Sequence, residues 1–445
     1  MRENFDSGAD LIIPAAVDSY DRKYVSTRER KKDVGYTDRA WRKNVRGTFY
    51  IKALGRMYMK PVIDMTKEYG IVLEGGGARG AYQVGAWKAL NEAGIKISGV
   101  AGTSVGALNA AMICMGDLEK TEKLWENISY SKVMKVDDNI MSQVFQGKLE
   151  MTEALKHSMK LFVDGGADIT PLKELIAENI DEKLIRDGAI NFYLLTFSIS
   201  DMRELDLDMK EVEEGMMPDL LLASAYLPVF KNEKLHGKTY MDGGMFNNVP
   251  LESLVKRGYQ DIIMVRIFGP GREKKVKLSD DITVLSVEPR VDLGNILDFD
   301  STKSRRNIKI GYYDTMRLIY GLKGKIYYIE ENQEECYYLN QLIHISEDNK
   351  TALCGYYKID TSKELLTRSY LEFVLNAVAA ELKLGKEWTY GGLYISTLEA
   401  AAKLLRVQKY KIYTIEAFRK EVLQKARAKK DLLLLPEFIR AILDV

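Results

Sequence analysis

The chain has 445 residues, of which 46% are hydrophobic and 29% charged, so a wholly disordered or fibrous protein is excluded. Its 65 Lys and Arg residues balance 64 Asp and Glu residues, and the formal net charge of +1 argues against a dedicated nucleic-acid binder. Three cysteines and three histidines are too few for a disulfide framework or a structural zinc site, so no metal is expected. The first 18 residues show no signal-peptide pattern, and the few cysteines favour a reducing, cytoplasmic compartment.

Residues 1–65 differ in composition from the rest of the chain and are expected to form a separate basic segment. Residues 21–60 contain thirteen Lys and Arg against four acidic residues, a net charge of +9. Such a stretch is typical of a solvated tail or of a charged helix packed on a domain, and we favour this interpretation. The alternative is an arm for an anionic membrane surface, where each basic residue contributes about 1 kcal/mol.

An α/β pattern begins near residue 69. Short apolar runs predict strands, and helical spacing that ends at a glycine predicts helices. The expected strands cover 70–74, 97–101, 190–199, 262–267 and 282–287, and the expected helices cover 81–93 and 105–115. The predicted fold class is therefore α/β, with a mostly parallel sheet flanked by helices. The longest uncharged stretch, 97–115, contains three glycines and four Ser, Thr or Asn residues, which favour a strand, a turn and a buried helix over a membrane span.

The last part of the chain, residues 331–445, is expected to be mostly helical. A capping-box pattern at 361–364 predicts a helix to about residue 384, and a second one at 396–399 predicts another helix start. Residues 403–430 combine ten basic and two acidic residues with apolar residues spread among them. This pattern is typical of a basic amphipathic helix at a membrane surface and equally of a solvated helix packed on a domain.

A glycine-rich motif, Gly75-Gly76-Gly77-Ala78-Arg79-Gly80, lies between an expected strand and an expected helix. Its spacing fits the dinucleotide motif G-x-G-x-x-G, which also needs an acidic residue about 20 positions further on. Residues 93–116 contain no Asp or Glu, and no Gly-Lys-Ser/Thr follows the glycines. A nucleotide site is therefore not expected.

A second motif, Gly102-Thr103-Ser104-Val105-Gly106, has the G-x-S-x-G pattern of a nucleophile elbow. Small neighbours allow the sharp turn from strand to helix that exposes the serine hydroxyl. The apolar strand before it and the apolar helix after it strengthen this interpretation. The alternative is an ordinary turn of small residues with a capping hydroxyl.

A serine nucleophile needs a base, and the three histidines lie in no recognisable base motif. The segment Tyr240-Met241-Asp242-Gly243-Gly244 offers a carboxylate at the end of a short strand. Taken alone, Asp-Gly-Gly is better explained as a turn signal.

Together and in this order, the three motifs resemble the patatin-like phospholipase family. The resemblance implies that Ser104 is the nucleophile and Asp242 the general base of a Ser–Asp dyad. It also implies that Gly75, Gly76 and Gly77 form an oxyanion loop, with Arg79 beside it. The resemblance extends over residues 66–330 and includes further matching text around the motifs: Ala223-Ser224-Ala225, Pro228, Phe230, Asn248, Pro250, Asp292-Leu293-Gly294, Asp298-Phe299-Asp300 and Gly311-Tyr312.

The activity implied by the resemblance is hydrolysis of acyl esters of phospholipids or related lipids, without a cofactor. An apolar groove is expected beside Ser104; four methionines at 202, 209, 216 and 217 suit such a wall, although core filling is favoured for them. Arg79 has three open roles: oxyanion stabilisation, phosphate binding or bracing of the loop. Alternatives to the lipase are a carboxylesterase or acyltransferase, an effector lipase activated by a partner and, least favoured, a non-enzymatic membrane scaffold. A lipase of this kind is expected to act peripherally at a membrane.

Overall fold

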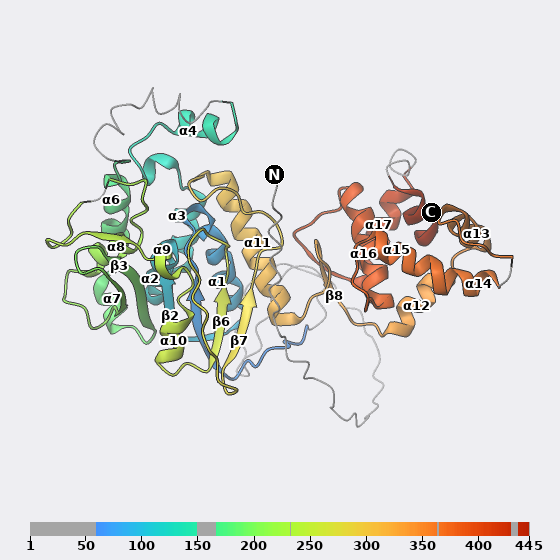
Figure 1. Cartoon of the computed structure of the whole chain (residues 1–445), viewed down its shortest axis with the longest axis horizontal. Coiled ribbons are helices and arrows are strands. Elements are labelled where there is room, and N and C mark those ends of the chain that lie inside the picture. Colours follow the sequence, from blue (N-terminus) through green and yellow to red (C-terminus); the bar gives the residue numbers. More distant parts are fainter. Residues whose placement is uncertain (1–58, 149–165, 232, 363–364, 429–434, 445) are drawn as a thin grey trace, which may run out of the picture. The chain divides into compact units, whose positions relative to one another are not determined.

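The computed structural model describes residues 59–148, 166–231, 233–362, 365–428 and 435–444 (Figure 1). These residues all belong to one compact unit, residues 53–445. Nearly all of the basic segment 21–60 lies outside the described residues, and the division of the chain at residues 65 and 330 stays a prediction. In the described part, no helix has both the length and the apolar character required to cross a membrane.

The central sheet has seven strands, six of them in the order β4-β3-β2-β1-β6-β7. The pairs β1–β2, β1–β6, β2–β3 and β6–β7 are parallel, whereas β4 and β5 both run antiparallel to β3. The predicted mostly parallel sheet is confirmed. The strands are β1 (Glu68–Leu73), β2 (Lys96–Thr103), β3 (Asn191–Ser198), β4 (Arg203–Asp208), β5 (Tyr240–Asp242), β6 (Asp261–Val265) and β7 (Thr283–Val287).

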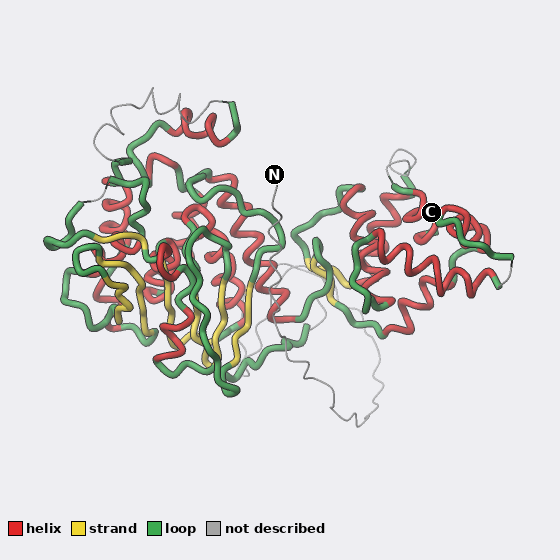
Figure 2. Tube along the Cα trace, viewed as in Figure 1, coloured by secondary structure: helices red, strands yellow, loops and turns green. Residues whose placement is uncertain are grey.

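Helices flank the sheet (Figure 2). Successive residues of a strand face opposite sides of a sheet. Ile71 belongs to the larger apolar core, while Val72 belongs to a smaller cluster with Leu254 of α10 on the other face. Both faces are therefore buried, as the apolar strands predict. The helices of this part are η1 (Gly77–Gly80), α1 (Ala81–Ala93), α2 (Val105–Met115), α3 (Leu118–Glu126), η2 (Tyr130–Lys132), α4 (Asp138–Phe145), α6 (Thr170–Asn179), α7 (Glu182–Asp187), α8 (Met217–Ser224), α9 (Gly244–Asn247), α10 (Leu251–Lys256) and α11 (Ser301–Tyr320).

The two helices predicted at 81–93 and 105–115 are confirmed to the residue as α1 and α2. Each ends at a glycine in the left-handed region, Gly94 with φ 79° and Gly116 with φ 75°. A residue without a Cβ adopts this conformation at little cost, which is why the stops were readable from the sequence.

The C-terminal part is mostly helical, as predicted, and has a hydrophobic core of its own (Figure 2). It contains the short parallel pair of β8 (Tyr328–Glu330) and β9 (Ile412–Thr414). Its helices are α12 (Glu335–Ile343), α13 (Glu347–Tyr356), α14 (Leu366–Ser369), the π-helix η3 (Tyr370–Val374), α15 (Leu375–Glu381), α16 (Tyr390–Leu404), α17 (Ile415–Ala426) and α18 (Glu437–Leu443).

Neither capping box in this part marks a helix start, although the helix predicted to end near residue 384 is present as α14, η3 and α15, from Leu366 to Glu381. The first helix begins at Leu366, beyond the predicted box at 361–364. The second begins at Tyr390, where the Thr389 hydroxyl accepts a hydrogen bond from the Gly392 amide. Glu399 instead lies in the middle of α16, where its carboxylate accepts hydrogen bonds from the amides of residues 325–327. A tertiary partner thus uses the acid that the local pattern assigned to a helix start.

The stretch 403–430 does not form one amphipathic helix. It covers the end of α16, a loop, β9 and α17. Its apolar residues Leu405, Ile415 and Phe418 are buried in the C-terminal core, so they are not free to insert into a lipid layer. Within the described residues, the interpretation as a helix packed on a domain fits α17.

Gly106 sets how closely α2 crosses the end of β1. A Cβ at this position would lie 2.3 Å from the Leu73 carbonyl oxygen, so the helix would have to move away from the strand. We expect Gly106→Ala to lower the free energy of unfolding by about 1–3 kcal/mol, measured by urea denaturation. The matched control is Gly355→Ala in α13, where a Cβ meets no atom within 4 Å. This control is expected to be neutral or slightly stabilising, and equal losses in both variants would contradict the close-approach argument.

Candidate active site

Ser104 occupies the sharp turn between β2 and α2. Its φ of 55° and ψ of −128° are unfavourable for a residue with a side chain, at a typical cost of about 1–3 kcal/mol. The Ser104 amide donates a hydrogen bond of 2.8 Å to the Ser224 hydroxyl, which in turn donates one of 2.6 Å to the Leu195 carbonyl. These two bonds tie the turn to α8 and β3, and they hold the strained conformation in place.

Asp242 reaches Ser104 because β2 and β5 pair with successive residues of β3. Leu195 is paired with Thr103 at the end of β2, and the next residue, Thr196, is paired with Asp242. The Ser104 hydroxyl donates a hydrogen bond of 2.6 Å to Oδ2 of Asp242. The structure therefore brings together two residues that lie 138 positions apart in the sequence.

The Asp242 carboxylate is buried, and burial raises its pKa from 3.8 to about 6. Two hydrogen bonds oppose this shift because they favour the charged form, one from the Ser104 hydroxyl and one of 2.7 Å from the Gly244 amide to Oδ1. A carboxyl group with a pKa near 6 is ionised at neutral pH and still accepts a proton readily. Gly243 and Gly244, predicted as part of the base motif, form the start of α9 directly after Asp242.

The glycine-rich loop lies beside Ser104, and its amide groups are not equivalent. The Gly75 amide donates to the Asn248 carbonyl at 3.1 Å, and the Ala78 amide donates to Ile296 at 2.7 Å. Among the described residues, the Gly76 and Gly77 amides have no acceptor. Gly77 has a φ of 53° and lines the same cavity as Ser104, and a Cβ there would lie 2.1 Å from the Ile296 carbonyl oxygen. Of these two unused donors, the Gly77 amide belongs to a residue that lines the cavity together with Ser104, whereas the Gly75 amide is already occupied.

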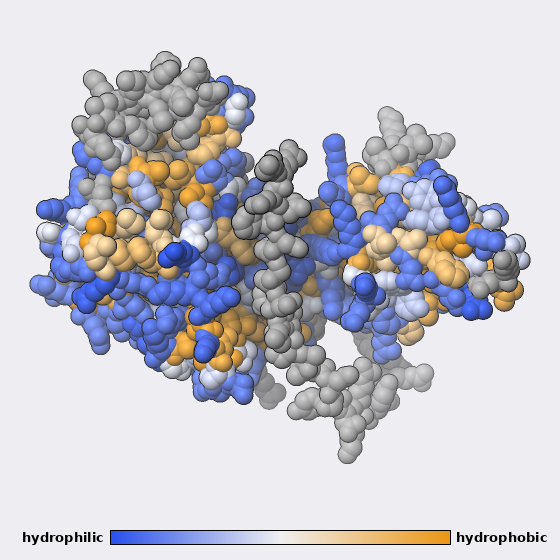
Figure 3. Space-filling model, in the orientation of Figure 1, coloured by the Kyte–Doolittle hydropathy of each residue, from blue (hydrophilic) through white to orange (hydrophobic). Residues whose placement is uncertain are grey.

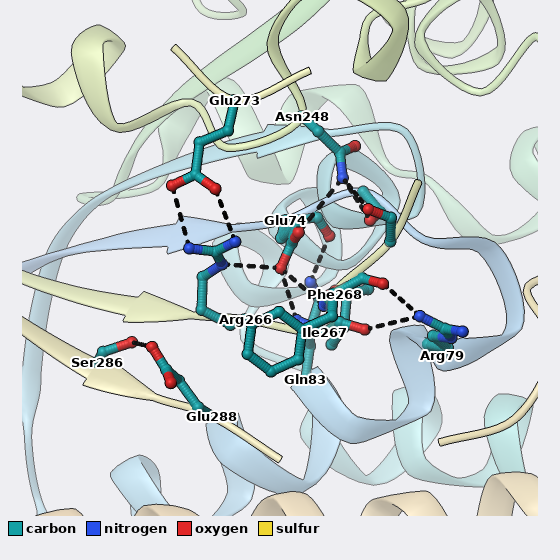
Figure 4. Close-up of polar contacts among 12 residues, drawn as sticks. Glu74, Arg79, Gln83, Asn248, Arg266, Ile267, Phe268, Glu273, Ser286 and Glu288 are labelled. Carbon is teal, nitrogen blue, oxygen red and sulfur yellow. Dashed lines mark hydrogen bonds and ion pairs between the residues drawn. The ribbon is translucent and has the colours of Figure 1, made fainter. Parts of the chain in front are cut away.

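Arg79 braces the loops behind the glycines (Figure 4). Its Nε donates to the Gly294 carbonyl at 2.7 Å, and its Nη1 donates to the carbonyls of Ile267 and Phe268. Of the three roles left open by the sequence, this geometry matches bracing.

Glu74, the residue before the glycines, is a buried carboxylate that joins several segments (Figure 4). Its Oε2 accepts hydrogen bonds from the Ile267 amide at 2.7 Å, from the Phe268 amide at 3.0 Å and from Nε of Arg266 at 3.0 Å. Asn248 fixes the same loop from the other side, since its side-chain amide donates to the Gly75 carbonyl at 3.1 Å. The backbone of the glycine loop is thereby held from two directions.

A cavity lined largely by apolar residues opens next to Ser104. Val105, Leu108 and Met112 of α2 line one side of it, and residues of α3, α6 and the segment 225–230 line the rest. Among the residues that the structure describes, none of the lining side chains is charged. The empty space in it, including the part open to solvent, is about 840 Å³.

None of the four methionines considered from the sequence lines this cavity. Met209 and Met217 are core residues, as favoured, whereas Met202 is exposed. The sequence also left roles unassigned at Glu74, Ser224 and Asn248. Ser224 and Asn248 lie in sequence segments that match the family, and Glu74 is an acid at the end of an apolar strand. Each residue could therefore be noticed in the sequence, but its hydrogen-bond partners could not.

A known family matches the part of the chain that contains Ser104 and Asp242. Residues 71–255 match the patatin-like phospholipase family. A patatin-like phospholipase domain-containing protein of Caenorhabditis elegans, ZK370.4, is 30% identical over 202 residues, which are 44% of this chain and 13% of that protein. The neuropathy target esterase sws of Drosophila melanogaster is 27% identical over 214 residues, 48% of this chain and 14% of that protein.

Among solved structures, VipD from Legionella pneumophila aligns with a TM-score of 0.37 and 15% identity over 88% of this chain and 94% of that one. By contrast, the chain spans only about one seventh of the length of the two curated relatives, ZK370.4 and sws. The family model and the curated relatives confirm the resemblance read from the motifs: residues 71–255 of this chain match the patatin-like phospholipase family.

Proposed function

We propose that this chain is a lipid acyl hydrolase that cleaves carboxylic esters of phospholipids or related lipids. The observation that carries the proposal is the 2.6 Å hydrogen bond from Ser104 to the buried Asp242, at a cavity whose described lining residues carry no charge. A serine becomes an activated nucleophile when its hydroxyl is hydrogen-bonded to a base, here a carboxylate, that accepts its proton. The match to the patatin-like phospholipase family supports lipid esters as the substrate class.

In the first half-reaction, Ser104 Oγ attacks the ester carbonyl carbon and its proton passes to Asp242. The negative charge that develops on the carbonyl oxygen faces the Gly76 and Gly77 amides, and such donors typically contribute about 3–4 kcal/mol each. The ester C–O bond then breaks, and the alcohol part of the lipid leaves with the proton from Asp242. Gly75 supports this loop through its carbonyl and amide, and Arg79 supports it through its guanidinium, without either facing the oxyanion.

In the second half-reaction, a water molecule attacks the acyl-enzyme and gives its proton to Asp242. Cleavage of the bond to Ser104 Oγ releases the fatty acid, and the serine recovers a proton from Asp242. No cofactor takes part in either half of the proposed reaction.

The cavity suits a long acyl chain. Val105, Leu108 and Met112 follow one another along α2, and the eight steps from Ser104 to Met112 span about 12 Å at about 1.5 Å per residue. One leaflet of a bilayer has a hydrocarbon depth of about 15 Å, half of the usual 30 Å. The wall along α2 is thus long enough to cover most of a membrane-lipid acyl chain.

The first test is fatty-acid release from liposomes of mixed phospholipids by the native chain and by Ser104→Ala. We expect release by the native chain and a loss of at least about a thousandfold in the variant, because the nucleophile is removed. Equal release by both would contradict the proposal. A series of soluble esters with increasing acyl length serves as the control for substrate class, and a clear preference for the shortest ester would favour a carboxylesterase instead.

The pH dependence follows from the raised pKa of Asp242. The base must be ionised to accept the serine proton, so the protonated form that prevails below about pH 6 is inactive. We expect kcat/KM for a soluble ester to fall about tenfold per pH unit below about pH 6 and to stay level above it up to about pH 8. A profile that stays level down to pH 4 would contradict the assignment of Asp242 as base.

The same burial predicts that Asp242→Asn stabilises the fold while abolishing turnover. A carboxyl group with a pKa of about 6 in the folded chain and 3.8 in the unfolded chain destabilises the fold as pH rises from about 4 to 6. Above that range the cost is about 3 kcal/mol, at about 1.4 kcal/mol for each pH unit between the two values. The asparagine removes this cost and keeps donors and acceptors for Ser104 and Gly244.

Urea denaturation at several pH values measures this difference. The variant should be more stable than the native chain at pH 8, by up to about 3 kcal/mol, and the two should converge near pH 4. A variant that is less stable at every pH would show that the carboxylate stabilises the fold.

A further inference from the structure

Four loops at one edge of the central sheet each expose a large apolar side chain. The residues are Met202 in the β3–β4 turn, Val229 before β5, Met245 in α9 and Phe268 after β6, with exposed fractions of 75%, 45%, 46% and 49%. Between residues 66 and 330, the described chain exposes two other such side chains, Leu184 and Leu278. We call the edge formed by residues 199–203, 227–231, 233–239, 243–247 and 266–277 the docking edge.

Hydrogen bonds join these loops to one another and to the candidate active site. The Arg272 amide donates to the Gly244 carbonyl at 2.9 Å, which connects the loop of Phe268 to α9. The Ile199 amide donates to the Thr239 carbonyl at 2.9 Å, and the Asp242 backbone amide donates to the Tyr226 carbonyl at 2.8 Å. These bonds connect the segment that contains Val229 to β3 and to Asp242. Leu227 and Phe230 line the apolar cavity, so the docking edge borders the cavity itself.

Two of the four apolar residues are kept at positions where a side chain is unfavourable. Met202 has a φ of 49° and Phe268 a φ of 48°, in the left-handed region that favours glycine. The Phe268 backbone amide donates a hydrogen bond to the buried Glu74 carboxylate, which helps to hold this conformation. Strained backbone is often found at functional sites, and exposed apolar side chains that lie together often mark contact surfaces.

The docking edge also carries cations without acidic partners. The loop 268–278 has four basic residues and one acid, a net charge of +3. Arg272, Lys275 and Lys277 are exposed and form no ion pair with a residue that the structure describes. Lys274 is paired with Glu204, and Glu273 with Arg266. Figure 3 shows apolar surface over α9 and the adjoining loops, with hydrophilic surface around it.

We propose that the docking edge binds the surface of an anionic lipid bilayer, an inference that deepens the proposed function. The four apolar side chains enter the boundary between headgroups and acyl chains, and Arg272, Lys275 and Lys277 face the anionic headgroups. This orientation turns the cavity beside Ser104 toward the lipid, so an acyl chain enters it without crossing water. The bilayer is thus held by the loops around the site and not by the buried apolar residues of 403–430.

The test is co-sedimentation of the full-length Ser104→Ala chain with vesicles, so that binding is measured without turnover. One set of vesicles is phosphatidylcholine, and the other is phosphatidylcholine with phosphatidylserine. We expect tighter binding to the anionic set. On the Ser104→Ala background, the apolar variant Met202→Gly/Phe268→Gly should weaken binding to both sets by about fivefold or more. Glycine accepts the φ values of both positions, so this variant should keep its fold, checked by its melting temperature.

The charge variant Arg272→Gln/Lys275→Gln/Lys277→Gln should lose about tenfold or more of its affinity for the anionic vesicles and keep its affinity for the neutral ones. Its matched control removes the same charge elsewhere, in Lys358→Gln/Lys383→Gln/Lys386→Gln, and the apolar control is Leu184→Ser. Both controls are expected to bind as the parent does.

Three outcomes would overturn the inference: no binding of the parent to either set, edge variants that bind as well as the parent, or equal losses in edge and control variants. The first outcome, combined with Ser104-dependent release of fatty acid from detergent-dispersed phospholipid by the native chain, would leave the proposed function standing. Vesicle binding that depends on the docking edge, without hydrolysis of any ester, would support the docking surface and contradict the proposed function.

Discussion

One edge of β3 holds the candidate active site together, because it pairs first with β2 and then with β5. Leu195 and Thr196 are neighbours in the chain, and their partners are Thr103 and Asp242. This pairing sets Asp242 next to the turn that follows β2. The Leu195 carbonyl also accepts the bond from Ser224 that fixes Ser104. Backbone pairing is stiff, so the distance between hydroxyl and carboxylate is set before any substrate arrives.

Two buried carboxylates near the site illustrate opposite uses of burial. The Glu74 carboxylate accepts hydrogen bonds from Arg266 and from two backbone amides, so its negative charge is compensated and it holds the loops together. Asp242 has a hydroxyl and one amide but no cation, and its pKa therefore rises. A base that must accept and return a proton needs this incomplete compensation, whereas a structural acid is better with full compensation. The same strand-to-helix edge of the sheet accommodates both.

The glycine loop and the exposed edge depend on the same network. Glu74 fixes the amides of Ile267 and Phe268, and the carbonyls of these two residues accept from Arg79. The Gly76 and Gly77 amides of this loop have no acceptor among the described residues, and Phe268, held by the same carboxylate, has a half-exposed side chain. The chemistry of the site and the surface proposed to meet the lipid are thus built on one set of contacts.

Sequence patterns alone were sufficient for the α/β class, for α1 and α2, and for the motifs that carry Ser104 and Asp242, because these signals are local. Apolar runs, glycine stops and a small-residue turn each act within a few residues of the chain. The tertiary structure decided what depends on distant partners: that Gly75 is occupied by Asn248, that Arg79 braces carbonyls and that Glu399 caps no helix. It also decided that 403–430 is not one helix, because buried contacts with the C-terminal core outweigh a local amphipathic pattern. Hydrogen-bond partners and burial are properties of residues brought together by the fold, and no local pattern contains them.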